Sequence, residues 1–217
     1  MNFKQCEATN YKSGRIGTIE FIVIHYTGNN GDSAKNNADY FARSKNLSAS
    51  AHYFVDENEV WQSVKDTDTA WHCGAKTYKH NKCRNSNSIG VELCSCKDNN
   101  GKYYFKDNTI TNAANLVKEL MKKYNVPIEN VIRHYDVTGK QCPAPMVDDA
   151  ALWNRFKEML REKKKLESGN DIVWELMNGK HKIEISEVER AVQALDKAKD
   201  SEEFLSLYWI LYKLVNN

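Results

Sequence analysis

Apolar runs alternate with amphipathic stretches over the first 166 positions of the chain. In the segment 19–26, four consecutive apolar residues from Phe21 to Ile24 predict a central strand that is covered on both faces. Shorter runs rich in aromatic and β-branched residues, bounded by turn residues, predict the other strands. These are expected at 48–55, 60–63 and 88–94 and in the segment that ends at Ile132, with a hairpin joining the first two.

Alternation within the segment 88–94 separates the two faces of that strand. Every second residue from Ile89 to Leu93 is apolar, whereas Gly90 and Glu92 point to the opposite side. A carboxylate on a central strand costs free energy unless it is paired or has a function. Glu92 is therefore a candidate functional residue, and an edge strand with Glu92 in solvent is the alternative.

Three amphipathic stretches of helical period lie between or after these strands. The first spans about 34–45, with Asp32 or Ser33 as its cap, and the others are expected at about 110–124 and 148–165. The loose alternation of strands and helices predicts an α/β fold, in which a mixed central β-sheet is flanked by helices.

A different pattern begins after a short hinge at Gly169 and Asn170. Three helical periods follow, and Ser186 with Glu189 forms the capping box of the middle one. They predict a small C-terminal three-helix domain of residues 170–217, beside a larger domain of residues 1–166. A unit of about fifty residues is marginal by itself, so it is expected to lean on the larger domain or to self-associate.

Charge is unevenly distributed along a chain of ordinary composition, which has 41% hydrophobic and 28% charged residues among 217. The net charge is +2, and residues 167–217 hold six Lys or Arg and ten Asp or Glu, a net −4, which leaves +6 for residues 1–166. A basic first domain suits an anionic polymer, although an ordinary solvated surface explains the excess equally well. No apolar run is long enough for a transmembrane segment, and we expect neither a membrane nor a nucleic-acid partner.

Cysteine usage bears on the compartment in which the protein is made. The first residues lack the apolar run of a secretory signal, so synthesis in a reducing compartment is expected. Metal-binding or structural roles are more common there than disulfides. The six cysteines are Cys6, Cys73, Cys83, Cys94, Cys96 and Cys142.

The segment 131–143 contains most of the candidate chemistry. His134 and Cys142 lie eight positions apart in it, with Lys140 two positions before the cysteine. Imidazole and thiolate are donors that suit zinc, and His25 at the exit of the first strand is the best third ligand. Three protein ligands leave one position of a zinc ion for water, as in many catalytic sites.

Further polar residues complete this hypothesis. Water activated by zinc attacks carbonyl groups, while Glu92 can accept its proton and Lys140 can stabilise the developing oxyanion. Trp71 and His72 suit a substrate-binding cleft, although a single Trp is more often buried in a core. The alternative, a structural zinc, needs a fourth protein ligand. The sequence offers His52, His72 and Cys73 for that position.

Five segments, in this order across residues 19–145, resemble the zinc-dependent N-acetylmuramoyl-L-alanine amidases of the type-2 amidase family. That family includes phage endolysins and the peptidoglycan recognition proteins. The segments are Ile24-His25-Tyr26-Thr27, Ser50-Ala51-His52-Tyr53-Phe54-Val55, Ala70-Trp71-His72-Cys73-Gly74, Ser88-Ile89-Gly90-Val91-Glu92, and Arg133-His134-Tyr135-Asp136 through Lys140-Gln141-Cys142-Pro143.

The resemblance implies a role for each candidate residue. The implied zinc ligands are His25, His134 and Cys142. Lys140 and Glu92 match catalytic residues of the family, and His72 matches a residue close to the substrate. Some members carry a catalytic Tyr directly before the His of the second strand, where this chain has Ala51. The resemblance to the endolysin branch then implies that Glu92 takes this role.

The resemblance also implies a substrate. The expected reaction is hydrolysis of the amide between N-acetylmuramic acid and L-alanine in bacterial peptidoglycan, as in a phage or prophage endolysin. Such a protein is expected to be made in the bacterial cytoplasm without a signal peptide and to act at the cell wall. Residues 170–217 then look like a cell-wall-binding domain, with a secondary wall polymer as its ligand or a homo-oligomer through its helices. The alternatives are a non-catalytic peptidoglycan-binding receptor and a cytosolic amidase that recycles wall fragments.

Overall fold

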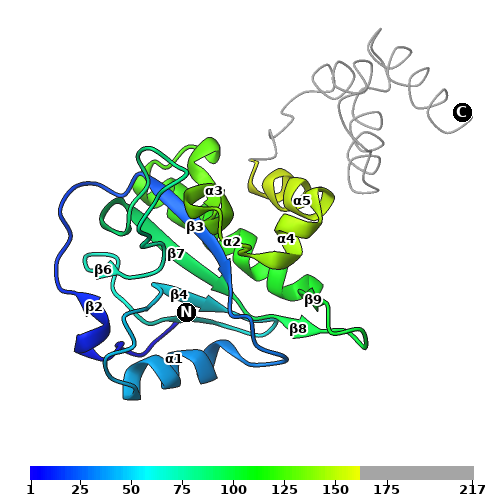
Figure 1. Cartoon of the computed structure of the whole chain (residues 1–217), viewed down its shortest axis with the longest axis horizontal. Coiled ribbons are helices and arrows are strands. Elements are labelled where there is room, and N and C mark those ends of the chain that lie inside the picture. Colours follow the sequence, from blue (N-terminus) through cyan, green and yellow to red (C-terminus); the bar gives the residue numbers. More distant parts are fainter. Residues whose placement is uncertain (162–217) are drawn as a thin grey trace, which may run out of the picture. The chain divides into compact units, whose positions relative to one another are not determined.

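A computed structural model describes residues 1–161 as helices packed on both faces of a six-stranded sheet (Figure 1). Only β4 and β5 run antiparallel to each other, while every other neighbouring pair is parallel. The prediction of an α/β fold with a mixed, helix-flanked sheet is therefore confirmed. The strand order is β1 (Asn2–Phe3), β5 (Val60–Gln62), β4 (Tyr53–Val55), β7 (Ser88–Leu93), β3 (Phe21–Tyr26) and β10 (Val131–Arg133).

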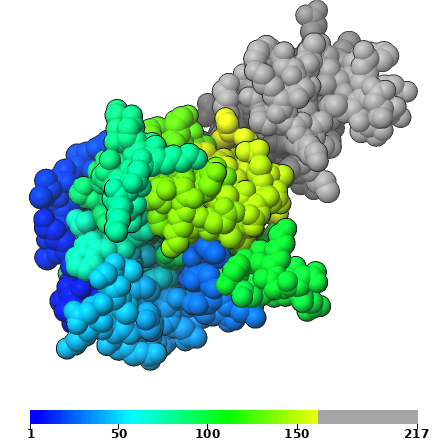
Figure 2. Space-filling view, viewed as in Figure 1, coloured from blue at the N-terminus to red at the C-terminus, as the bar shows by residue number. Residues whose placement is uncertain are grey.

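Five α-helices and several short elements complete the described part of the chain. Two pairs of two-residue strands form small antiparallel ladders outside the main sheet, and one of them, the β8–β9 hairpin, projects from the body of the protein (Figure 2). No helix within residues 1–161 is both long and apolar enough to cross a membrane. The helices are α1 (Ala34–Arg43), α2 (Asp107–Tyr124), α3 (His134–Thr138), α4 (Ala144–Asp148) and α5 (Ala150–Leu160). The small strands are β2 (Tyr11–Lys12), β6 (Thr69–Ala70), β8 (Cys96–Lys97) and β9 (Tyr103–Tyr104), and 3-10 turns span Ala8–Asn10, Asn85–Asn87 and Ile128–Asn130.

One face of the sheet packs against α2 and α5 and forms the main apolar core. Ile22 and Ile24 of β3 and every second residue of β7 from Ile89 to Leu93 point to this side, and all are fully buried. Their burial removes apolar surface from water, which is the main favourable term in folding. This face therefore contributes most of the packing that holds the sheet.

The opposite face is covered in two separate parts. Over β4 and β5, helix α1 packs its alanines against Phe54, which points away from the main core. At the other end of the sheet, Phe21 and Val23 of β3 form a small cluster with Val137 of α3 and two buried cysteines. His25, two positions beyond Val23 on β3, lies on this same face, as does Glu92 of β7.

Several expected boundaries differ from the observed ones. The edge strand β1 was not predicted, because two residues are too few to show a period. The expected strand at 48–55 is a strand only from Tyr53. The helix expected from about 148 begins at Ala150 as α5, and a separate short helix, α4, precedes it. The predicted three-helix domain, residues 170–217, lies outside the described residues.

Candidate metal centre

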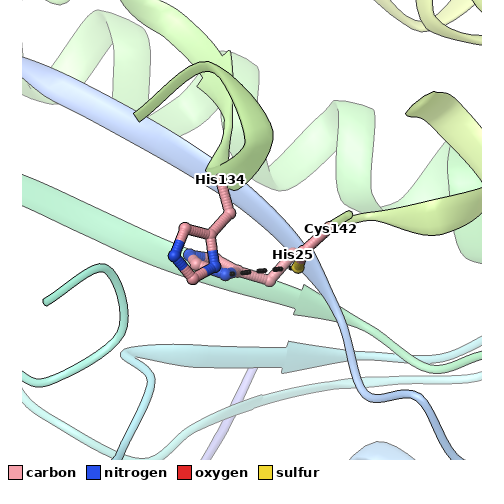
Figure 3. Close-up of side chains that lie close together, drawn as sticks. All are labelled: His25, His134 and Cys142. Atoms are coloured by element: carbon pink, nitrogen blue, oxygen red, sulfur yellow. Dashed lines mark hydrogen bonds between the residues drawn. The ribbon is translucent and has the colours of Figure 1, made fainter. Parts of the chain in front are cut away.

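Three potential ligands come from two adjacent parallel strands and the loop beyond them (Figure 3). His25 is the second-last residue of β3, and His134 is the first residue of α3, directly after β10. Cys142 follows α3, and its carbonyl oxygen accepts a hydrogen bond from the Tyr135 amide at 2.8 Å. This bond folds the loop back on α3, so the thiol lies beside both imidazoles.

The donor atoms of His25, His134 and Cys142 lie within 4.8 Å of one another, and all three side chains are buried. The His25 Nδ1 atom is 3.7 Å from the Cys142 Sγ atom. Zinc binds nitrogen at about 2.0 Å and sulfur at about 2.3 Å, which puts tetrahedral donors roughly 3.5 Å apart. In residues 1–161, no second group of three His, Cys, Asp or Glu residues has this geometry.

Burial sets the protonation of these ligands. Burial, with His134 and His72 nearby, holds the pKa of His25 well below its usual value. Burial and the Lys140 ammonium lower the pKa of His134 to about 4. Both imidazoles are therefore neutral near pH 7, which is the form that binds metals. Burial and the Glu92 carboxylate raise the pKa of the Cys142 thiol to about 12, so a metal must displace its proton.

Two buried polar atoms beside this group lack a hydrogen-bond partner within the described residues. They are the His134 Nδ1 atom and the Glu92 Oε2 atom. An unsatisfied buried acceptor costs about 1–3 kcal/mol, which is difficult to explain in a site that remains empty in function. The donor set, its spacing and these two atoms fit a zinc ion held by His25, His134 and Cys142.

Glu92 lies directly beside the ligand group. It pairs in register with His25 across β7 and β3, and its Oε1 atom is 4.0 Å from the His25 Nδ1 atom. Because β7 lies between β4 and β3, the alternative of an edge strand is wrong. Burial raises the pKa of Glu92 to about 8, although the Lys140 ammonium acts in the opposite direction.

The group opens onto a cleft. A pocket of about 260 Å³ is lined by the three ligands together with Glu92 and Lys140. A wider pocket of about 740 Å³ adjoins it and shares Trp71, His72 and Lys140 as walls. The half-buried Trp71 and His72 thus border both pockets. The structure brings all seven sequence-predicted site residues to one place.

The loop that carries Trp71 and His72 is held by residues that the sequence did not single out. The Asn85 side-chain oxygen accepts hydrogen bonds from the amides of His72, at 3.2 Å, and Cys73, at 2.8 Å. The Ser50 hydroxyl accepts a hydrogen bond from the Trp71 amide, and the Ser50 amide donates one to the Trp71 carbonyl oxygen. Both residues act over a distance of more than ten positions, so no local pattern marks them.

The three residues considered as a fourth protein ligand are engaged elsewhere. The His52 Nδ1 atom accepts the Gly90 amide at 3.0 Å, and the Cys73 Sγ atom lies 3.8 Å from the Ser88 hydroxyl. His72 contacts the far nitrogen of His25, Nε2, and not the side that faces Cys142. The group therefore has three protein donors in the described residues, the number typical of catalytic zinc.

Ala51 occupies the position at which some members of the resembled family carry a catalytic Tyr. Its side chain is buried with Phe54 and the alanines of α1. It offers no hydroxyl to the cleft, which leaves Glu92 as the carboxylate beside the ligands.

Comparison with known proteins places this geometry in a family. Residues 15–145 match the family described as N-acetylmuramoyl-L-alanine amidase. The chain is 36% identical over 156 residues to N-acetylmuramoyl-L-alanine amidase CwlL of Bacillus licheniformis, covering 66% of this chain and 41% of that protein. It is 32% identical over 150 residues to the amidase XlyA of Bacillus subtilis, covering 68% and 46%. The chain thus spans less than half the length of these curated relatives.

Solved structures with similar folds agree with this match. The structure described as PlyL has a TM-score of 0.61 and 29% identity, covering 75% of this chain and 97% of that one. The catalytic domain of XlyA has a TM-score of 0.60 at 29% identity, covering 74% of this chain and 100% of that one. The family match spans well over half of the sequence and includes all seven candidate site residues. The chain belongs to the N-acetylmuramoyl-L-alanine amidase family.

Proposed function

We propose that this protein is a zinc-dependent peptidoglycan hydrolase that cleaves the amide bond between N-acetylmuramic acid and L-alanine. The observation that carries the proposal is the buried group of His25, His134 and Cys142, which opens onto a cleft beside Glu92. The choice of this bond rests on family membership, because the relatives are named for its cleavage. The proposed site of action is the bacterial cell wall.

We assign roles to the side chains from their positions. A zinc ion bound to the three ligands would supply a Lewis acid that activates water for attack on a carbonyl group. The proposed role of Glu92, whose Oε1 atom is 4.0 Å from the His25 Nδ1 atom, is to accept the proton and pass it to the leaving amine. The exposed Lys140 borders both pockets, where its ammonium can stabilise the negative charge that develops on the carbonyl oxygen.

The cleft suits a polymer more than a small molecule. Its wider part extends past Trp71 and His72 toward Ser48 and Gly74, and we propose that the chain of the substrate lies there. Aromatic surfaces such as that of Trp71 favour contact with sugar rings or peptide. We assign Trp71 and His72 to substrate binding on this basis.

Residues 170–217 have a proposed role that rests on sequence alone. Two tryptophans and two tyrosines are among them, as expected of either a core or a glycan-binding surface. We propose that they anchor the enzyme to the wall. The fragment 1–168 should then bind intact walls less than the full chain does, while its rate on soluble muropeptide is retained. Equal wall binding by fragment and full chain would contradict this anchor. The tryptophans and tyrosines concerned are Trp174, Tyr208, Trp209 and Tyr212.

The direct test is digestion of purified peptidoglycan by the full chain, with and without a zinc chelator, followed by mass spectrometry of the released fragments. Free stem peptides that begin at L-alanine, and that disappear with the chelator, are the expected result. Fragments cut at another bond would show that the protein is a hydrolase but would contradict the proposed cleavage site. Wall binding without any release would instead support the receptor alternative.

A further inference from the structure

A chain of hydrogen bonds leads away from the ligand group through His72. The His25 Nε2 atom lies 3.0 Å from the His72 Nδ1 atom. The His72 Nε2 atom lies 3.1 Å from the Ser88 hydroxyl, which in turn donates to the Arg84 carbonyl oxygen at 2.7 Å. All three distances are those of ordinary hydrogen bonds.

The far end of this chain fixes the direction of every donor. A carbonyl oxygen can only accept, so the Ser88 hydroxyl proton points to Arg84. The Ser88 oxygen then accepts from Nε2–H of His72, which leaves Nδ1 of a neutral His72 as an acceptor. Nε2–H of His25 must donate to that acceptor. The remaining nitrogen of His25, Nδ1, is left with a lone pair.

That lone pair is on the side of the ligand group. The His25 Nδ1 atom is the one that lies 3.7 Å from Cys142 Sγ and 4.0 Å from Glu92 Oε1. With the opposite tautomer, a proton would occupy this position and His25 could not bind a metal. The tautomer of His25 therefore decides whether the group has three donors or two.

The sheet is shaped to admit the His72 ring. A Cβ atom added at Gly90 would lie 2.5 Å from the His72 Cγ atom and 2.8 Å from its Nδ1 atom, closer than real atoms approach. Gly90 lies on β7 between Ser88 and Glu92, on the same face of the sheet. A glycine inside a strand weakens it, and close approach of another group is a known reason to keep one.

We propose that His72 is a positioning residue that sets the tautomer of His25, with Ser88 as its anchor and Gly90 as the space for its ring. This inference rests on the proposed function, because it assigns His72 a task in metal binding. It adds to the role of His72 at the cleft wall. A residue that only contacted substrate would need neither the bond to His25 nor the space at Gly90.

The test compares two near-isosteric substitutions, His72→Leu and His72→Asn. The Asn side-chain oxygen can take the place of Nδ1 and accept from His25, whereas Leu cannot. Zinc affinity, measured by competition with a chromophoric chelator, should fall about 10- to 100-fold in His72→Leu, the usual effect of losing such a partner. It should stay within about threefold of wild type in His72→Asn. Unfolding of the metal-free variants in urea provides the control for folding.

A second pair of variants examines the space for the ring. Gly90→Ala should lower zinc affinity as His72→Leu does, because it displaces the ring. Gly74→Ala is the control for zinc affinity alone, since its added Cβ would not meet His72 and would lie 3.4 Å from the side-chain amide nitrogen of Asn85, an ordinary contact. Histidine-selective ¹⁵N NMR of the wild-type chain should show protonated Nε2 on both His25 and His72. A protonated Nδ1 on metal-free His25 would overturn the inference.

The outcomes separate this inference from the proposed function. A wild-type chain that takes up no zinc would contradict the proposed function itself. A wild-type chain that binds zinc, with unchanged affinity in His72→Leu, would overturn only the positioning role. In that case, a raised KM in His72→Leu with unchanged zinc affinity would indicate that His72 only contacts the substrate.

Discussion

The two faces of the central sheet are built from alternate residues of the same strands, yet they differ in almost every physical property. Toward α2 and α5, Ile22 and Ile24 of β3 are fully buried in an apolar cluster. Toward the cleft, β3 presents His25, and β7 presents Gly90 and Glu92. The first face is lined by apolar side chains, whereas the second holds Glu92 Oε2 and His134 Nδ1, which have no hydrogen-bond partner within residues 1–161.

The difference shows how a small domain can tolerate a costly site. Each large apolar side chain buried on the first face contributes about 1.5–3 kcal/mol. Each buried acceptor left unsatisfied on the second face costs about 1–3 kcal/mol. The packed face therefore offsets the polar one, and violations of packing rules at one location are expected where function requires them.

Glu92→Gln should have the largest effect and should alter only the polar face. Turnover of peptidoglycan is expected to fall about 10²- to 10⁴-fold, the usual contribution of a positioned acid or base. The free energy of unfolding should stay equal or rise, because a buried carboxyl becomes neutral at every pH. Zinc content and wall binding are the controls. A wild-type rate in this variant would remove Glu92 from the mechanism.

Ile22→Ala should act on the packed face alone. Loss of this fully buried side chain leaves a cavity against the α2 and α5 side and should cost about 2–5 kcal/mol in urea unfolding. Turnover per folded molecule should remain that of wild type, since Ile22 points away from the cleft. A fall in turnover that matched the Glu92→Gln variant would show that the two faces are not independent.

Ser33→Ala should have the smallest effect, on the helix that covers the polar face over β4 and β5. The Ser33 hydroxyl accepts the Asn36 amide at 3.1 Å and caps α1. Its removal should cost about 1 kcal/mol of stability with no change in zinc affinity. Ser33→Asp, which restores a cap, is the matched control. A loss of zinc affinity in Ser33→Ala would couple α1 to the ligand group.

The sequence predicted the residues of this comparison better than their contacts. The period-two alternation in 88–94 predicted that Glu92 lies on the face opposite the apolar residues. Ser33, which caps α1, was one of the two cap residues that the sequence predicted. The helix at His134–Thr138 was not predicted, because five residues between a strand and a glycine show no helical period.

Contacts between distant segments were outside what the pattern could predict. The bond from His25 to His72 spans 47 positions, and it depends on Asn85 holding the loop of His72 in place. Gly90 was the one visible signal, as a glycine inside a strand of apolar residues. The sequence could show that something approaches Gly90, but not which side chain it is.

The most direct test of the account is the zinc content of the purified chain, determined by mass spectrometry of the metal after dialysis against trace zinc. The wild-type chain and Ile22→Ala should each retain one zinc per folded chain, while Cys142→Ser should retain much less. Zinc should also raise the melting temperature of the wild-type chain, as a ligand of the folded state does. Undiminished zinc in Cys142→Ser, or none in the wild type, would contradict a metal centre on the polar face of the sheet.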